Sequence, residues 1–345
     1  MNIRNLKFDE LESEVIRLGF EKFRAKQIFE WLHKHFVIDF DKASNIGTEL
    51  KSKLYQSFDF SVPTIYKEFV SKIDGTKKYL ISLNDNYVIE SVLMKYKYGY
   101  SVCISSEVGC DMGCKFCAST IGGLKRNLEP YELLSQVYLI EKHNNINISN
   151  IVIMGSGEPL ANLNNILKFL NIINDKNGKN ISMRNITLST CGIVESINRL
   201  SDYKLPITLA LSLHAPNNEI RKEIMPIANK YDLKDVMEAM ANYFIITNRR
   251  ITFEYSLIDG LNNSDDNANE LVDLFHNSFK NKHIDFNVNL IPVNTIKESN
   301  FVKPDNDKVN SFKRILENNN INVTIRRELG KDISGSCGQL RASVK

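Results

Sequence analysis

The run Cys110-Asp-Met-Gly-Cys114-Lys-Phe-Cys117 holds three of the six cysteines of this chain within eight residues, and an aromatic residue, Phe116, directly precedes the last one. Three thiolates on one short loop suit three corners of a [4Fe–4S] cube and leave the fourth iron open to a ligand that is not protein. A structural zinc site is the alternative, but it needs four closed ligands, usually two separated cysteine pairs, and no partner pair is present. The spacing therefore predicts an iron–sulfur cluster.

The chain is long and apolar enough for one barrel-sized unit with an appendage, at 345 residues and 43% hydrophobic composition. It has no stretch of about 18 apolar residues, and its first residues mix acids with bases, unlike a signal peptide. Thiols reserved for metal or redox chemistry fit a reducing compartment. We expect a cytoplasmic protein without a membrane segment. The net charge of +3 does not by itself indicate a polyanion-binding protein.

Changes of pattern divide the chain into four parts. Residues 1–62 carry apolar residues at helical spacing and predict a small helical accessory domain that contacts RNA. Residues 63–95 contain alternating β-branched and aromatic runs, which predict a β-ribbon leading into the core. Residues 96–332 form the predicted core. Residues 333–345 form a tail whose glycine and serine content predicts mobility, and this tail carries Cys337.

Short apolar strands alternate with helical segments along the core, which predicts βα units and a parallel sheet. The strand near Val102 is followed by NIVIMG, NITLST, PITLALSLH, RITFEYSLI and DFNVNLIPV. About six such units fall short of the eight of a closed barrel, so we predict an α/β fold, an incomplete (β/α)6 barrel with its active face at the carboxyl ends of the strands. The pattern alone does not distinguish this fold from a doubly wound sheet.

Polar residues recur where each predicted strand ends, and they would converge on one mouth. They are Gly155, Gly157, Glu158, Ser189, Ser212, His214 and Asn294. The run around Gly157 is not a dinucleotide fingerprint, and the chain has no Walker P-loop, so nicotinamide and nucleoside triphosphates lack their usual support. The glycines allow backbone to approach a ligand, and Glu158 has the charge to bind an ammonium group such as that of methionine.

Eight segments spread over nearly the whole chain resemble the RlmN family, the radical S-adenosylmethionine (SAM) enzymes that methylate carbon 2 of adenine in 23S rRNA and tRNA. They are FRAKQIFEWLH, CISSEVGCDMGCKFCAST, GSGEPLAN, STCGIV, LSLHAPN, NLIPVN, VTIRRELG and CGQL. Two departures stand out. Ser156 replaces a methionine common in the family, and Gly335-Ser336 replaces a pair of alanines before Cys337.

The resemblance implies a role for each matching residue. The cluster would be bound by Cys110, Cys114 and Cys117, and SAM would be contacted by Gly157, Glu158, Ser189, Ser212, Leu213, His214 and Asn294. Cys337 would be the methylated cysteine, Cys103 would form a transient disulfide with it, and Glu90 or Cys103 would accept the proton.

The resemblance also implies a mechanism and partners. Carbon 2 of adenine is electron-poor and cannot attack a methyl sulfonium directly, so Cys337 would first take a methyl group by displacement. A second SAM molecule, cleaved by an electron from the cluster, would yield a radical that abstracts hydrogen from this methyl group, and the resulting carbon radical would add to adenine. The implied partners are 23S rRNA, tRNA and a low-potential electron donor such as flavodoxin or ferredoxin. We expect a monomer.

Several residues have simpler interpretations. Cys191 is expected to be structural or to line the pocket, and His33, His35, His143 and His283 are expected on helix or strand surfaces. The basic pairs Lys125-Arg126, Arg249-Arg250 and Arg326-Arg327 are predicted phosphate contacts, and the segment with Arg24 and Lys26 is a predicted RNA contact in the N-terminal module.

Three alternatives remain open at this point. The Cfr resistance family methylates carbon 8 of the same adenosine, although Pro159 in GEPLAN favours carbon 2. A non-catalytic iron–sulfur protein that binds RNA would keep its function without Cys337. A radical enzyme acting on small molecules would not need the pair of Cys103 and Cys337.

Overall fold

The computed structural model describes residues 1–280, 282–294, 296 and 299–340, and its centre is one ten-stranded mixed sheet. The strand order is β1-β2-β3-β4-β7-β8-β9-β10-β11-β12. The strands of this sheet are β1 (Thr64–Val70), β2 (Lys77–Ser82), β3 (Val88–Tyr96), β4 (Gly99–Ile104), β7 (Ile148–Ile153), β8 (Ile186–Thr190), β9 (Thr208–Ser212), β10 (Ile251–Leu257), β11 (Phe286–Pro292) and β12 (Val323–Ile325). A separate two-stranded sheet pairs β5 (Glu107–Val108) with β6 (Arg126–Asn127).

Strand β4 and strands β7 to β12 run parallel, and helices follow most of them. Among the described residues β12 pairs only with β11, so the sheet curves without closing. The prediction of an incomplete βα barrel is confirmed, with β12 as a further parallel strand at the edge. Strand β10 is buried along its whole length, and the polar residues Thr252, Glu254 and Ser256 alternate with its apolar residues.

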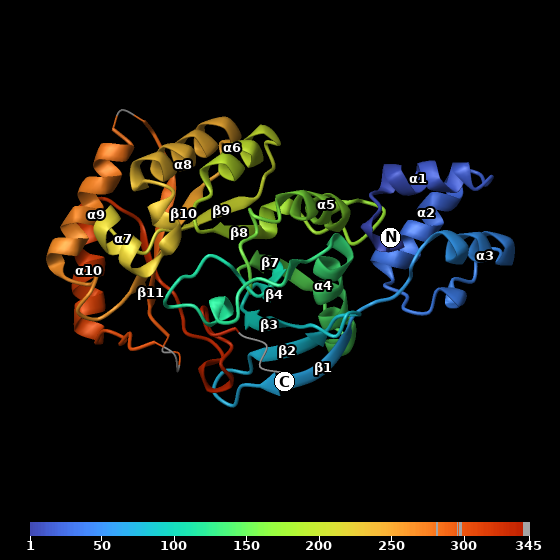
Figure 1. Ribbon diagram of the computed structural model, residues 1–345, viewed down its shortest axis with the longest axis horizontal. Coiled ribbons are helices and arrows are strands. Elements are labelled where there is room, and N and C mark those ends of the chain that lie inside the picture. Colours follow the sequence, from blue (N-terminus) through green and yellow to red (C-terminus); the bar gives the residue numbers. More distant parts are fainter. Residues whose placement is uncertain (281, 295, 297–298, 341–345) are drawn as a thin grey trace.

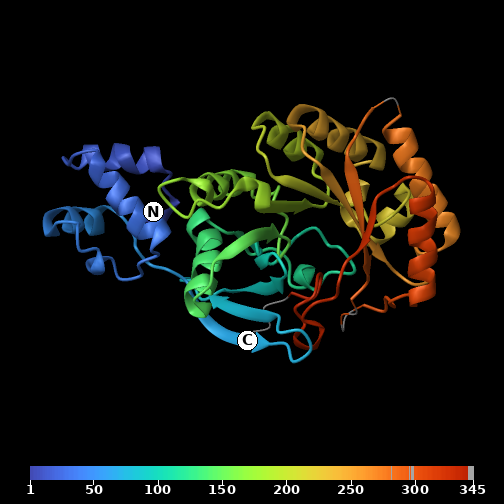
Figure 2. The same ribbon diagram turned by 180° about the vertical axis from the view of Figure 1, so that it is seen from behind.

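Helices cover the sheet and form the N-terminal module (Figures 1 and 2). They are α1 (Phe8–Arg17), α2 (Phe23–Phe29), α3 (Thr48–Ser57), α4 (Pro130–Asn144), α5 (Leu163–Asn174), α6 (Val194–Asp202), α7 (Asn218–Ile224), α8 (Leu233–Thr247), α9 (Asp265–Ser278) and α10 (Asn306–Asn318). Helix α4 shows why these bounds follow from sequence: Pro130 occupies its first turn, and the left-handed Asn145 (φ 51°) ends it. No helix within the described ranges is long and apolar enough to cross a bilayer.

The N-terminal helices α1, α2 and α3 lie at one end of the long axis, opposite α9 and α10 (Figure 1). The Asn5 side chain donates a hydrogen bond to Glu129 at the start of α4 (2.7 Å). His33 is fully buried in this contact region, against the ring of Phe29 and 3.3 Å from the Tyr138 hydroxyl. Its predicted surface position is therefore wrong, because helix α4 covers it, and burial lowers its pKa to about 3. The other three histidines named above are exposed, as predicted.

The predicted ribbon is present as antiparallel β1, β2 and β3, and it continues the same sheet as the core. A tight hairpin at Lys97-Tyr98 joins β3 to β4. Gly99 (φ +129°) is required here, because a Cβ atom would lie 2.3 Å from the Ser149 hydroxyl oxygen. Residue Cys103 on β4 is thereby held in register with Val92 on β3 and Val152 on β7.

Candidate active site

Two cavities meet at the carboxyl ends of the parallel strands. The first, here called the loop cavity, is lined by the cysteine loop and by strand ends, including Cys110, Cys114, Cys117, Gly157, Glu158, Ser189, Cys191, Ser212, His214, Asn294 and Cys337. The second, here called the tail cavity, is lined by residues of β3, β4, β7, α10 and the C-terminal tail, including Met94, Tyr96, Cys103, Asn294, Arg326 and Cys337. Nearly all the predicted site residues therefore lie around connected space.

The cysteine loop places three thiols on one wall. Cys110 and Cys114 are buried and Cys117 is half-buried. Thr120 Oγ1 donates to the Cys117 carbonyl (2.9 Å), and the Lys115 amide donates to the carbonyl of Ile224 (3.0 Å), which fixes the loop on helix α7. Burial raises the pKa of the Cys110 thiol to about 12 and that of the Cys117 thiol above its usual value. These thiols need a metal centre to stabilise them as thiolates.

The thiol arrangement fits a cluster better than a single ion. Among the described residues, no three His, Cys, Asp or Glu side chains are grouped closely enough to hold one metal ion. In a [4Fe–4S] cube each thiolate binds a different iron, so the thiols stand farther apart than around one zinc ion. All three thiols of this loop face the same cavity. Their chemistry and placement suit three corners of such a cube.

Glu158 is held at the cavity wall by backbone amides. Its carboxylate oxygens accept hydrogen bonds from the amides of Leu160 (3.0 Å) and Cys191 (2.7 Å), and the side chain is 3% exposed. The amide of Glu158 in turn donates to Glu107 (2.9 Å). Burial, followed by the charges of Glu158 and Asp111, raises the pKa of Glu107 to about 7. The buried carboxyl groups of Glu158 and Glu107 are thus linked through the Glu158 amide, beside the cysteine loop.

Gly157 allows its loop to approach the segment after β4. It adopts φ +108°, and a Cβ atom there would lie 2.6 Å from both the Ser106 hydroxyl oxygen and the Glu107 Cβ. The carbonyl of Ser156 accepts the amides of Ser106 (2.8 Å) and Glu107 (3.1 Å). The sequence pattern predicted close backbone approach at Gly157, and the approach is to this neighbouring segment.

The ends of β8 and β9 bring Ser189 and Ser212 together, with their hydroxyl oxygens 3.4 Å apart at the loop cavity. His214 follows in the left-handed conformation (φ +58°), and its Nδ1 accepts the Ser256 amide (2.9 Å). Burial lowers the pKa of His214 to about 3, so the ring is neutral and its proton is on Nε2. Leu213 is fully buried and is absent from the lining of the loop cavity. Its amide donates to the Glu254 carbonyl (3.0 Å).

Asn294 and Cys337 lie on the wall shared by both cavities. The Asn294 side-chain amide donates to the carbonyl of Cys337 (3.0 Å), while its buried Oδ1 has no partner among the described residues. A buried amide oxygen left in this way is costly, and a donor from a bound ligand would satisfy it. Cys337 itself is exposed.

The tail carrying Cys337 is attached to the cysteine loop as far as it is described. The Ala118 amide donates to the Gly338 carbonyl (2.7 Å), and the Ser119 hydroxyl donates to the Leu340 carbonyl (2.7 Å). Ser119 also pairs with Ser156 (3.1 Å), so the residue that departs from the family pattern takes part in holding the tail. These hydrogen bonds hold the described part of the tail, which the sequence predicted to be mobile, against the cysteine loop.

Cys103 faces the tail cavity together with Cys337, whereas Glu90 lies apart. Burial raises the pKa of the Cys103 thiol to about 12, and its side chain packs in an apolar cluster with Val92 and Leu340. Glu90 is 2% exposed and forms an ion pair with Lys78 (3.2 Å), but it lines neither cavity. The structure thus brings the two thiols to one cavity and places Glu90 outside its lining.

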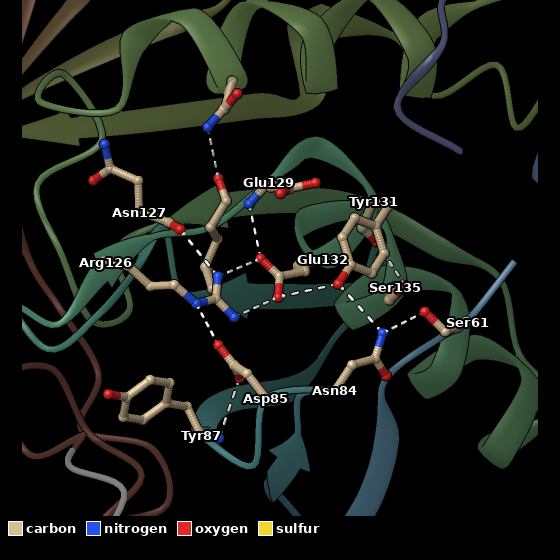
Figure 3. A network of polar contacts seen from close by, with 12 residues as sticks. Ser61, Asn84, Asp85, Tyr87, Arg126, Asn127, Glu129, Tyr131, Glu132 and Ser135 are labelled. Atoms are coloured by element: carbon tan, nitrogen blue, oxygen red, sulfur yellow. Dashed lines mark hydrogen bonds and ion pairs between the residues drawn. The ribbon is translucent and has the colours of Figure 1, made fainter. Parts of the chain in front are cut away.

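Two of the predicted phosphate contacts, Arg126 and Arg326, already form ion pairs with carboxylates of the protein. Arg126 binds Asp85 (2.6 Å) and makes a two-pronged contact with Glu132 (2.7 and 2.8 Å), as Figure 3 shows. Arg326 pairs with Glu254 (3.3 Å) and lines both cavities. Each guanidinium thus already neutralises a buried carboxylate of the protein, and its contact with phosphate stays a prediction.

Arg221 on α7 is a buried residue beside the loop cavity that the sequence analysis missed. It is fully buried, and it donates to the carbonyls of Cys191 (2.7 Å) and Leu213 (3.2 Å) beside the loop cavity. Its neighbours in sequence, NNEIRKEI, read as a surface helix, so no local signal marks it. Cys191, expected to line the pocket, does so.

Two family models match the chain. The radical SAM superfamily model covers residues 104–272, and the model for the N-terminal domain of ribosomal RNA large subunit methyltransferases covers residues 1–59. These matches span the cysteine loop, most of the βα units and the helical module.

Relatives match over nearly their full length. A probable dual-specificity RNA methyltransferase RlmN of Clostridium novyi is 51% identical, covering 99% of this chain and 97% of that protein. The similarly named protein of Lachnospira eligens is 49% identical, covering 99% and 95%. The crystal structure of a radical SAM methyltransferase from Sphaerobacter thermophilus is 37% identical and superposes with a TM-score of 0.92, covering 99% of both chains.

Proposed function

Because the chain belongs to the RlmN family and is a SAM-dependent radical RNA methyltransferase, we propose that it methylates carbon 2 of an adenosine in 23S rRNA and of an adenosine next to the tRNA anticodon. One observation carries the proposal: Cys337 lies on the wall between the loop cavity and the tail cavity, and Cys103 lines the latter. A thiol in that position has access to a methyl donor on one side and to an RNA base on the other. We therefore do not propose that the chain is a non-catalytic RNA-binding protein.

The residues of the loop cavity would hold the cofactors. Cys110, Cys114 and Cys117 would bind a [4Fe–4S] cluster, which together with SAM supplies the electron and the methyl group for radical chemistry. Glu158 offers a negative charge for the ammonium group of SAM. Neutral His214 and the Oδ1 of Asn294 offer hydrogen-bonding atoms in the same space.

Cys337 would carry the methyl carbon in two stages. Its thiolate attacks a methyl sulfonium and becomes a thioether, and the carbon is later joined to the adenine ring while still bonded to sulfur. The carbon gives up one hydrogen atom before this joining step. Release then requires loss of the ring proton and of one electron, for which the oxidised cluster would be the acceptor. The carbon–sulfur bonding electrons pass to carbon as a bond forms between the sulfurs of Cys103 and Cys337, and the carbon takes up a proton to become the methyl group. An external thiol or dithiol must reduce that disulfide before the next turnover, and each turnover consumes two SAM molecules.

The proton acceptor assigned by the resemblance is Glu90. Its carboxylate forms an ion pair with Lys78 (3.2 Å). Since Glu90 lies outside both cavities as described, a movement of the tail would have to connect it with the base. Cys103 is the other candidate for this step. A low-potential donor of the flavodoxin or ferredoxin type would supply electrons to a monomeric enzyme in the cytoplasm.

The proposal is tested by anaerobic reconstitution of the cluster, followed by incubation with methyl-labelled SAM, a chemical reductant, and either unmodified 23S rRNA fragments or unmodified tRNA. Mass spectrometry of the nucleosides should find 2-methyladenosine in both RNAs. Cys337→Ala should give none while retaining the visible absorbance of the cluster. A methyl group on carbon 8 would assign the chain to the Cfr reaction, and unmodified RNA from intact, reduced enzyme would overturn the proposal.

A further inference from the structure

The hairpin between β3 and β4 carries a stacked pair of tyrosines. The rings of Tyr96 and Tyr98 have centroids 5.0 Å apart and an interplanar angle of 6°. Tyr98 is 64% exposed, so one face of the stack is covered by Tyr96 and the other is open to solvent. A flat aromatic surface of this kind adds little to the core, because most of its outer ring stays in water.

The stack is continuous with the tail cavity. Tyr96 lines that cavity together with Cys103 and Cys337, and its hydroxyl points to the sulfur of Met94 (3.6 Å). Burial raises the pKa of Tyr96, with smaller contributions from Tyr98 and the two thiols, so the ring is uncharged at neutral pH. An aromatic surface therefore leads from the thiol pair to the protein exterior.

Positive charge lies beside this surface. Lys97 lies between the two tyrosines in sequence and is exposed, and the exposed Arg327 lines the tail cavity. Neither of these two cations forms an ion pair with another described residue. Cations beside an exposed aromatic face are the combination that binds single-stranded nucleic acid, in which phosphates meet the charges and bases meet the rings.

We propose that the Tyr96–Tyr98 stack is a platform on which a base neighbouring the target adenosine stacks when that adenosine enters the tail cavity. This inference rests on the proposed function. An adenosine removed from its helix leaves a neighbouring base without a stacking partner, and the exposed ring of Tyr98 offers a replacement. Stacking is tolerant of sequence, which suits an enzyme that acts on two different RNAs.

The experiment uses the reconstituted holoenzyme and an RNA hairpin substrate with 2-aminopurine, a base whose fluorescence is quenched by stacking, beside the target adenosine. Wild-type enzyme should quench this fluorescence on binding. Tyr98→Ala should abolish the quenching and raise Kd and KM for RNA on the order of tenfold, with kcat at saturating RNA within about twofold of wild type. Tyr98→Phe and Tyr98→Trp should retain both quenching and affinity. Tyr203→Ala, at a 48% exposed tyrosine beside α6, is the matched control.

The outcomes distinguish a failure of the stacking platform from a failure of the proposed function. If wild-type enzyme methylates RNA but Tyr98→Ala binds and quenches like wild type, the platform is wrong and the proposed function stands. If Tyr98→Phe loses as much as Tyr98→Ala, the hydroxyl makes the contact and stacking does not. If Tyr98→Ala alters sedimentation of the free enzyme and not RNA affinity, the surface binds a second copy of the chain. Failure of wild-type enzyme to modify any RNA would overturn the proposed function itself.

Discussion

The cysteine loop and the C-terminal tail contribute thiols to the same site but hold them in different ways. In the loop, Cys110 and Cys114 are buried, and a main-chain hydrogen bond from Lys115 joins the segment to α7. In the tail, Cys337 is exposed, and hydrogen bonds to Ala118, Ser119 and Asn294 hold its segment in place. The three thiols of the motif thus lie on a loop of the fold that buries two of them, whereas the thiol proposed to carry the methyl group stays exposed on a segment that packs against this loop.

The sharpest way to break this comparison is to remove one thiol from each region. Cys114→Ala should lose both the cluster and methylation, because a corner of the cube is lost. Cys337→Ala should lose methylation entirely while the cluster remains, since the three cysteines proposed to bind the cluster all belong to the loop. Visible absorbance and labelled-methyl transfer measure the two properties. Loss of the cluster in Cys337→Ala would contradict the division of roles.

The fixed side is probed next by Glu158→Gln. The substitution removes a buried negative charge and leaves one acceptor oxygen, so only one of the Leu160 and Cys191 amides, which bond to different carboxylate oxygens, keeps its hydrogen bond. We expect SAM affinity to fall about tenfold, equivalent to about 1.4 kcal/mol, because a charge-assisted hydrogen bond becomes neutral. Equilibrium dialysis with labelled SAM measures the Kd. A Kd within twofold of wild type would remove Glu158 from the SAM site.

The pH dependence of stability provides a third test on the fixed side. The pKa of Glu107 is about 7 in the folded protein and 4.5 as its ordinary value, so the folded state binds the extra proton between these limits. The free energy of unfolding should therefore decrease as pH rises from 4.5 to about 7. Glu107→Gln should lack this decrease and be about 1–3 kcal/mol more stable than wild type at pH 8.

Denaturant unfolding of the holoenzyme at several pH values measures the effect. Glu21→Gln, at an exposed carboxylate in the N-terminal module, is the control. Identical pH profiles for wild type and Glu107→Gln would show that Glu107 has the same pKa in the folded and unfolded protein.

The smallest expected effect sharpens the comparison on the tail side. Ser119→Ala removes the hydrogen bond to the Leu340 carbonyl (2.7 Å) and the contact with Ser156. Loss of about 1 kcal/mol should speed hydrogen exchange in residues 334–340 about fivefold without changing exchange in the cysteine loop. Ser13→Ala, whose hydroxyl bonds only within α1, is the control. Unchanged exchange in the tail would mean that other contacts hold it.

Local patterns predicted the elements of the fold well. The alternation of strands and helices indicated an open βα barrel, and the polar residues at strand ends indicated its mouth, because the side-chain periods of helices and strands are local properties. The cysteine spacing likewise predicted the loop. What local pattern missed is long-range pairing: that the ribbon β1–β3 continues the core sheet, and that helix α4 buries His33.

The candidate site shows the same limit. The resemblance supplied the residues, yet only the tertiary structure shows that Cys103 and Cys337 share one cavity and that Leu213 and Glu90 stay off it. Charged residues were the hardest to place. Local pattern did not indicate the partners of Arg126 and Arg221, because those partners, such as Asp85 for Arg126 and the Cys191 carbonyl for Arg221, are distant in sequence.

The tail packs on the cysteine loop but is synthesised after it, so the two parts of the site form at different times during translation. Domains fold as they leave the ribosome at about 5–20 residues per second, so the loop at Cys117 emerges roughly 220 residues, or about 10–40 seconds, before Cys337. For that interval a nascent chain carries the wall that would hold the cluster but lacks the thiol that seats beside it. Under the proposed function the site therefore stays incomplete until Cys337 has emerged, and a chain terminated before this residue should not methylate RNA.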